Sequence, residues 1–193
     1  MEDKINIAEI LRDMPEGTKL YSPILGEVEL EVIKTIEYGC EYPIIVTTTE
    51  PEGGSICFAD NGLYYNEYAG AEPTLFPSRY MRDWTKFFKR GDVVTNKSFG
   101  TMAVFESWAD VDYTKFNVTI KCYSDSTFGI NRVCITNAYS KATDEQKAEF
   151  IAKAEEYYNG KYNPETLRVE SIEPECEFKP FDRVLVRDND EQE

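Results

Sequence analysis

A row of three carboxylates is the first group in this sequence whose type and spacing could do chemistry. Glu27, Glu29 and Glu31 alternate with apolar residues, so on a strand they would share one face at intervals of about 6.7 Å. That interval is close to two base-pair steps of DNA, at about 3.4 Å each. The row predicts either a surface that mimics nucleic-acid phosphates and binds a basic partner, or a solvent-exposed face that only keeps the protein soluble.

A cationic stripe follows in residues 79–90, where Asp83 is the only acid. Guanidinium and ammonium groups at this density could hold a phosphate, a nucleotide or an acidic partner. The alternative is pairing within the chain, where each exposed ion pair is worth about 0–1 kcal/mol. The cations of the stripe are Arg79, Arg82, Lys86, Lys89 and Arg90.

Aromatic side chains accompany these cations, and they could stack on a ligand or fill a protein interface. Packing in the core is the favoured interpretation for Trp84, Phe88 and Phe105. Trp84 is nevertheless kept among the candidate contacts because it lies between the cations. The residues predicted to bind a partner are Glu27, Glu29, Glu31, Arg79, Arg82, Trp84 and Lys86.

Catalysis is disfavoured by what the sequence lacks. The chain has no histidine, which excludes Ser-His-Asp and Cys-His catalysis, two-His-one-carboxylate iron sites and Cys₂His₂ zinc within it. It also lacks a CxxC pair, a P-loop, a GxGxxG motif and a GxSxG motif. The pairs Asp110/Asp112 and Asp188/Asp190 lack the glycine and distal glutamate of a calcium loop. We therefore predict a protein that is not an enzyme, without a cofactor or a metal ion.

Composition limits the partners and the compartment. The chain has 193 residues with 36 acidic and 21 basic side chains, and its formal charge of −15 disfavours direct binding to nucleic acid. The sequence contains no run of about 18 apolar residues, so it predicts no membrane-spanning helix. Its acidic N-terminus is unlike a secretory signal. The five cysteines are widely spaced, which is typical of small apolar fillers in a reducing cytoplasm.

The first part of the chain, residues 1–77, is predicted to be a short helix followed by a β-meander. Asn6 and Glu9 have capping-box spacing at the start of a helix over residues 6–13. Val28, Leu30 and Val32 alternate with the acidic row and predict a half-buried strand. Two further strands are expected over residues 43–49 and 55–59.

The second part, residues 78–137, is predicted to form a small SH3-like barrel after the aromatic and basic segment. Aromatic and basic residues in 78–90 recur with helical spacing, although an extended crossing segment is also open. Short strands separated by polar turns then predict the barrel. These strands are expected over residues 92–95, 101–108, 116–123 and 133–136.

The third part, residues 138–193, is predicted to be a packed helix, one strand and an acidic terminal strand. Thr143 and Gln146 have capping-box spacing, and Gly160 is the expected cap at the other end of a helix over residues 143–158. The buried stripe of this helix should consist of Phe150, Ala154 and Tyr157. A turn with one strand is expected over residues 162–172. A last strand over residues 178–186 repeats the F-K-x-x-D-x-V pattern of residues 88–94. It could pair with an earlier sheet, pair with a partner such as a second copy of the chain, or fray. The fold class is α+β, mostly β.

Several phrases in the sequence resemble an uncharacterised family of hypothetical proteins from phages and prophages of gut bacteria. The phrases are GTKLYSP from Gly17 with GEV from Gly26, LFPS from Leu75 with RDWTKF from Arg82, FKRGDVV from Phe88, ATDE from Ala142, and FKPFD from Phe178 with VLVRD from Val184. The resemblance covers most of the chain and implies an origin in a mobile element. It implies no activity and no catalytic residue.

The sequence leaves three hypotheses for function. The first is a non-enzymatic interaction protein of a phage or prophage that contacts a protein partner in the bacterial cytoplasm. The second is an acidic anti-defence inhibitor that mimics nucleic acid. The third is a small module that binds a nucleotide or another phosphate ligand through the cationic stripe.

Overall fold

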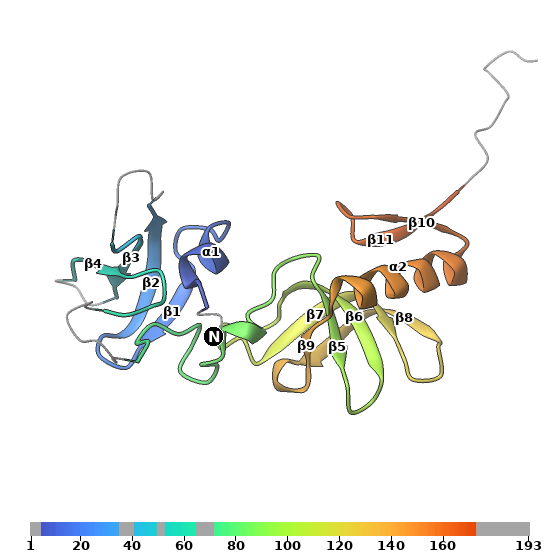
Figure 1. Cartoon of the computed structure of the whole chain (residues 1–193), viewed down its shortest axis with the longest axis horizontal. Coiled ribbons are helices and arrows are strands. Elements are labelled where there is room, and N and C mark those ends of the chain that lie inside the picture. The colour runs from blue at the N-terminus through green and yellow to red at the C-terminus, as the bar shows by residue number, and fades with distance from the viewer. Residues whose placement is uncertain (1–4, 35–40, 50–52, 65–71, 173–193) are drawn as a thin grey trace, which may run out of the picture.

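The computed structural model describes residues 5–34, 41–49, 53–64 and 72–172 of the chain (Figure 1). Two antiparallel sheets lie side by side, and a long helix with a β-hairpin covers the second sheet. The protein is therefore α+β and mostly β, as predicted. The first sheet is a meander in chain order of β1 (Lys19–Ser22), β2 (Gly26–Ile33), β3 (Ile44–Thr48) and β4 (Ser55–Phe58).

Helix α1 (Ile7–Leu11) begins at the predicted cap, because the side-chain oxygen of Asn6 accepts a hydrogen bond of 2.9 Å from the Glu9 amide. Its apolar face enters the core of the first sheet, where Ile7 and Leu11 are fully buried. The amide of Ile7 donates to the carbonyl of Asp60, so the helix is also held by the turn after β4.

Strand β2 follows the predicted alternation only over its first half. Val28 and Leu30 are buried, whereas Val32 is 43 % exposed although the alternation predicted it to be buried. The pairing of β2 with β3 shifts register between Leu30 and Val32, and a bulge of this kind turns the following side chains to the other face.

The second sheet has the strand order β8-β7-β6-β5-β9. Four of its strands form a meander, and the last one returns past the 3₁₀ helix η2 (Thr136–Ala138) to pair with the first. The sheet remains open in the described part of the chain, because no pairing joins β8 to β9. The closed barrel expected from the sequence is thus not observed. The strands are β5 (Val93–Asn96), β6 (Thr101–Trp108), β7 (Lys115–Cys122), β8 (Phe128–Ile135) and β9 (Ser140–Lys141).

Strand β8 begins earlier than predicted, because Gly129 and Asn131 in its first half are residue types that are depleted in strands. Most of its side chains are exposed, and it pairs with β7 over its whole length. Asn131 adopts a positive φ of 52°, which is unusual within a strand. Tertiary pairing with β7 thus decides the conformation of a segment whose own propensity is weak.

The segment of residues 78–90 contains no α-helix, so the helical interpretation was wrong. Only the short 3₁₀ helix η1 (Trp84–Lys86) forms there. The hydroxyl of Ser78 accepts from the amides of Tyr80 and Met81, and the carboxylate of Asp83 accepts from the amide of Thr85. Such local side-chain bonds compete with a helical ladder for the same amides.

An aromatic seam joins the two sheets. Phe87 packs in the core of the first sheet and Phe88 in that of the second, so successive residues enter different cores. The Trp108 ring lies between them, with ring centroids 5.5 Å from Phe87 and 6.0 Å from Phe88. The seam consists of Trp84, Phe87, Phe88, Trp108 and Tyr113.

Tyr113 adds a polar link to this seam. Its hydroxyl donates a hydrogen bond of 2.6 Å to the carbonyl of Lys19 on β1, although Tyr113 itself precedes β7. Burial raises the pKa of Tyr113 to about 12, so the hydroxyl stays neutral and can donate over the whole physiological range.

Helix α2 (Asp144–Tyr158) has the predicted capping box, with the Thr143 hydroxyl bonded to the Gln146 amide and the Gln146 side chain bonded to the Thr143 amide. At its other end the left-handed residue is Asn159, with φ 51°, and not Gly160. Phe150 and Ala154 are buried as predicted. Tyr157, which was also predicted to be buried, is 53 % exposed.

The far face of the second sheet is covered by α2 and a hairpin. Phe150 shares a core cluster with Val104 and Ile120 of the sheet and with Leu167 of the hairpin turn. The sequence predicted one strand in this region, but two strands form, β10 (Gly160–Asn163) and β11 (Arg168–Ser171). The predicted last strand over residues 178–186, its repeat of residues 88–94 and its pairing with a second copy lie outside the described residues.

None of the helices in the described part combines the length and the apolar character that a membrane-spanning helix needs. The cysteines of this part are free, and they differ in environment. Cys134 is buried as expected for a filler, whereas Cys57 is exposed.

The capping box gives a first quantitative prediction. Replacing Thr143 by alanine should lower the free energy of unfolding by about 1 kcal/mol, because the Gln146 amide loses its acceptor at the helix start. Urea denaturation followed by circular dichroism measures this loss. Thr143→Ser keeps the acceptor and should change stability much less, and equal losses in the two variants would contradict this role.

Candidate interaction surface

A short turn after the first sheet presents the candidate surface. Phe76 pairs with Tyr21 of β1 through two backbone hydrogen bonds of 2.8 and 2.9 Å. The Ser78 hydroxyl then accepts from two amides of the turn and donates to the Asp112 carbonyl at 2.7 Å. Further along, the Trp84 indole N–H donates to the Leu75 carbonyl at 2.8 Å. The turn of residues 78–82 is thus held at both ends.

This turn carries two exposed arginines above aromatic rings. The guanidinium of Arg79 lies 5.6 Å and that of Arg82 5.7 Å from the ring centroid of Tyr21, and Arg82 also lies 5.3 Å from the Phe76 ring. Within the described ranges, neither arginine forms an ion pair with a carboxylate. Tyr80, between them, is 67 % exposed. We call Arg79, Tyr80 and Arg82 the arginine turn.

The other cations of the predicted stripe point to separate places. Lys86 donates to the Asn137 carbonyl at 3.0 Å, and Arg90 donates to the Glu165 carbonyl at 2.8 Å. Lys89 forms an ion pair of 3.1 Å with Asp13 after α1. The stripe is therefore not continuous, and Lys86 serves to join neighbouring segments.

Trp84 is the predicted contact that the structure places in the core. It is only 4 % exposed and it packs edge-on against Phe87, with ring centroids 5.4 Å apart. A partner cannot reach its ring without unfolding the seam. Trp84 thus fixes the segment that bears the arginine turn and does not itself form the surface.

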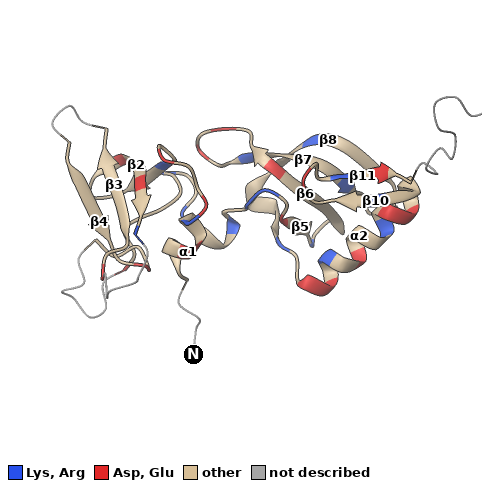
Figure 2. Cartoon of the chain, turned by 90° about the horizontal axis from the view of Figure 1, so that it is seen from above, with Lys and Arg blue, Asp and Glu red and all other residues tan. Residues whose placement is uncertain are grey.

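The acidic row lies on β2 as predicted, but its members are partly engaged within the sheet. Glu29 forms an ion pair with Lys19 of β1, and Glu31 accepts a hydrogen bond of 2.6 Å from the Ser55 hydroxyl of β4. Glu27 is exposed. Figure 2 shows acidic and basic residues in both halves of the described part of the chain.

In the described part of the chain, no cluster of three or more cysteine, aspartate or glutamate side chains could hold a metal ion. Asp110, one of the paired aspartates, instead caps the β6–β7 turn by accepting from the Thr114 amide and hydroxyl at 2.8 and 2.6 Å. Asp188 and Asp190 lie outside the described residues.

The sequence predicted the arginines of this surface but not the aromatic ring beneath them. The spacing of Arg79 and Arg82 was noted, but nothing local indicated that Tyr21, which lies almost sixty residues earlier, would lie beneath both. Tyr80 shares the helical spacing of the aromatic residues in 78–90, and this spacing does not indicate that its side chain is exposed. A signal for it exists in Ser78, whose type favours a turn over a helix.

No protein-family model, no curated protein and no solved structure matches the chain.

Proposed function

We propose that the protein is a non-enzymatic interaction module that binds an acidic surface of a protein partner through the arginine turn. The observation that carries this proposal is the pair of exposed guanidinium groups, held over aromatic rings with no carboxylate partner among the described residues. Arginine and tyrosine are among the residue types enriched at the hot spots of protein interfaces. An unpaired guanidinium is also ready to form two parallel hydrogen bonds with a partner carboxylate.

The setting proposed for this module is the bacterial cytoplasm and a phage or prophage origin, which the phrases of the sequence support. The strand order of the second sheet, with a 3₁₀ helix before its last strand, supports an SH3-like arrangement for that unit. The acidic row is less suited to mimic nucleic acid than its spacing suggested, because Lys19 and Ser55 engage two of its three carboxylates. We therefore favour binding through the arginine turn over the hypothesis of an anti-defence protein that mimics nucleic acid.

The test uses a photo-crosslinking amino acid in place of Tyr80 in the full chain, exposed to bacterial lysate. We expect capture of an acidic protein, with a yield that falls as salt rises, because exposed charge pairs are screened. The variant Arg79→Glu/Arg82→Glu should abolish this capture. It should remain folded, since cation–π contacts at exposed sites are worth only about 0.5–1 kcal/mol each.

A matched control separates the turn from net charge. Lys97→Glu/Lys147→Glu makes the same change of net charge at two exposed positions outside the turn, and it should leave capture unchanged. Capture that persists in the arginine variant would contradict the proposal. Stabilisation of the wild-type protein by inorganic phosphate or a nucleotide, lost in the arginine variant and without protein capture, would favour the small-ligand function at the same residues.

A further inference from the structure

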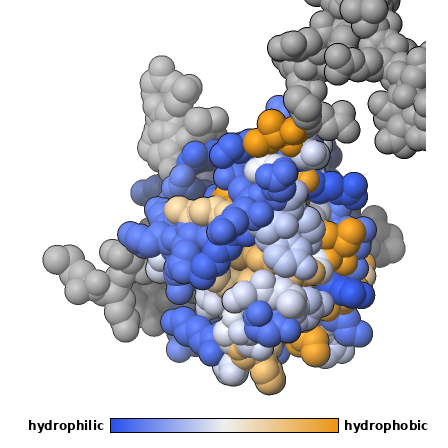
Figure 3. Space-filling model, turned by 90° about the vertical axis from the view of Figure 1, so that its right-hand side faces the viewer, coloured by the Kyte–Doolittle hydropathy of each residue, from blue (hydrophilic) through white to orange (hydrophobic). Residues whose placement is uncertain are grey.

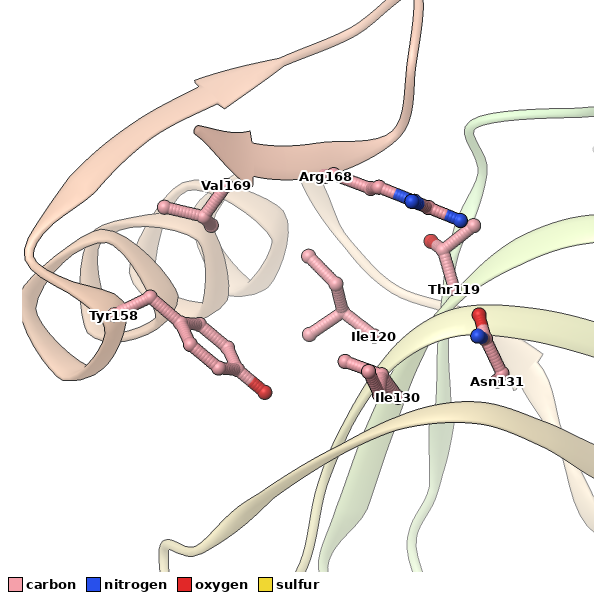
Figure 4. A pocket seen from close by; sticks show the side chains of 7 residues that line it. All are labelled: Thr119, Ile120, Ile130, Asn131, Tyr158, Arg168 and Val169. Carbon is pink, nitrogen blue, oxygen red and sulfur yellow. The ribbon is translucent and has the colours of Figure 1, made fainter. Parts of the chain in front are cut away.

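A pocket of about 230 Å³ lies away from the arginine turn, between the second sheet and the elements that cover it. Its walls come from β7 and β8 on one side and from the C-terminal part of α2 and β11 on the other (Figure 4). Figure 3 shows that the surface at this end of the molecule is mainly hydrophilic, with hydrophobic residues in separate spots. A broad apolar docking face is therefore not present on this view, and a small ligand is the occupant to consider.

The middle of the pocket is apolar. Ile120 of β7 is 2 % exposed and belongs to the core cluster beneath α2, and Val169 of β11 packs against the same cluster. Ile130 of β8 is 57 % exposed at the rim. These three side chains would contact the body of an apolar ligand, and the ligand would extend the existing core.

One end of the pocket is polar. Arg168 of β11, Thr119 of β7 and Asn131 of β8 lie together there, and the Thr119 hydroxyl oxygen is on the side of the pocket interior (Figure 4). Thr119 is 2 % exposed, and its hydroxyl has no hydrogen-bond partner among the residues that the structure describes. A buried hydroxyl without a partner is a rare and costly feature, so this hydroxyl is a candidate for a hydrogen bond to a ligand.

Arg168 is available to a ligand. It is exposed, and none of the described carboxylates forms an ion pair with it. Glu170 lies two residues after Arg168 on β11. Its carboxylate accepts hydrogen bonds of 2.9 Å from Asn163 and from Thr166. The Arg168 side chain lies beside Thr119 in Figure 4, so one carboxylate bound at this end of the pocket can contact both side chains.

The opposite end of the pocket is closed by Tyr158 of α2 (Figure 4). Burial raises the pKa of Tyr158, so its hydroxyl is neutral and can donate or accept one hydrogen bond. Along the pocket, the guanidinium of Arg168 and the hydroxyl of Thr119 come first, the apolar side chains follow, and the phenol of Tyr158 comes last.

We propose that this pocket binds a small monocarboxylic acid with a short apolar body. Its carboxylate would lie at Arg168 and accept from the Thr119 hydroxyl, while its apolar body lies along Ile120, Ile130 and Val169. A single guanidinium matches a planar carboxylate by a two-point contact, whereas a phosphate dianion would leave charge unpaired in a chain of formal charge −15. The volume of about 230 Å³ lies below the range of about 300–1,000 Å³ typical of drug-sized ligands, which favours a ligand smaller than a nucleotide.

Hexanoate is the probe for this proposal, with hexanamide as the neutral analogue and inorganic phosphate as the comparison anion. Binding to the full chain is measured by NMR titration of backbone amides and by the melting temperature. We expect hexanoate to shift amides of β7, β8 and β11 and to raise the melting temperature, because a ligand that binds only the folded state stabilises it. Hexanamide and phosphate should do neither.

Two variants make the test specific. Arg168→Gln should weaken hexanoate binding at least about tenfold, whereas Arg132→Gln, which removes the same charge from an exposed position of β8, should leave it unchanged. Thr119→Val removes the unpartnered hydroxyl at nearly constant shape. It should raise the melting temperature of the free protein and reduce the additional rise that hexanoate causes.

Three outcomes of these measurements would overturn the proposal. The proposal is overturned by absence of any response to hexanoate at about 10 mM, a concentration that would reveal even a millimolar dissociation constant. Equal binding to wild type and Arg168→Gln would also overturn it, as would equal responses to hexanoate and phosphate. None of these results bears on the arginine turn, because that surface is tested by variants at different residues.

Discussion

Replacing Phe87 by alanine is expected to lower the free energy of unfolding by about 3–5 kcal/mol. The side chain is 1 % exposed and lies in the aromatic seam, where it contacts Trp84, Trp108 and Tyr113 with ring centroids 5.1–5.5 Å apart. Its removal leaves a cavity between two sheets whose backbones are held by their own hydrogen bonds, so the cavity cannot collapse easily. The loss is large compared with the total stability of about 5–15 kcal/mol for typical proteins.

The measurement is urea denaturation followed by two probes. Both tryptophans of the chain, Trp84 and Trp108, lie in the seam, so their fluorescence reports on it, whereas far-UV circular dichroism reports on all sheets and helices. In the wild-type protein the two curves should coincide, because the seam couples the sheets into one cooperative unit.

Two further variants control this experiment. Phe99→Ala removes a phenyl ring that is 69 % exposed, and it should change stability by less than about 0.5 kcal/mol. Phe87→Leu keeps much of the buried volume and serves if the alanine variant does not fold, with a smaller loss expected. A loss below about 1 kcal/mol in Phe87→Ala would show that the seam does not contribute as the packing indicates.

The second large effect is expected from Gly160→Ala, with a loss of about 1–3 kcal/mol. A β-carbon at Gly160 would overlap the backbone carbonyl oxygen of Glu170 and would lie 2.8 Å from a methyl carbon of Val169. The overlapping atom is backbone and cannot rotate away, so the β10–β11 hairpin must shift. Because Arg168 and Val169 are on β11, the shift should also weaken hexanoate binding if the pocket is a ligand site.

Gly54→Ala is the matched control for this substitution. A β-carbon at Gly54 meets no atom within 4 Å, so the same chemical change should alter stability by less than about 0.5 kcal/mol. Thermal unfolding of both variants under the same conditions gives the comparison. Equal stability of Gly160→Ala and wild type would mean that the hairpin moves freely, contrary to its packing against α2.

Features that depend on a few neighbouring residues could be predicted from the sequence. The caps of α1 and α2 depend on side chains that reach amides three residues away, and both Asn6 and Thr143 occupy the predicted positions. The strands with strong alternation or β-branched runs were predicted within a few residues. The core roles of Phe88 and Phe105 followed from their apolar side chains alone.

Features that depend on distant segments could not be predicted in this way. The exposure of Val32 results from a bulge in the pairing with β3, and Tyr157 is exposed although its spacing on α2 predicted that it would be buried. The path of residues 78–90 depends on two cores that compete for adjacent aromatic rings. A helical spacing in that segment was real, but the two packing sites outweighed it.

The sequence by itself determined that the chain is mostly β, rich in buried aromatic rings and without the side chains that histidine-based catalysis requires. Only the tertiary structure decided which charged and polar groups remain free to bind. Lys86 and Arg90 are bonded to carbonyls, whereas Arg79 and Arg82 form no ion pair in the described part of the chain. The physical reason is that pairing depends on distances between segments far apart in sequence, which residue types and local spacing do not contain.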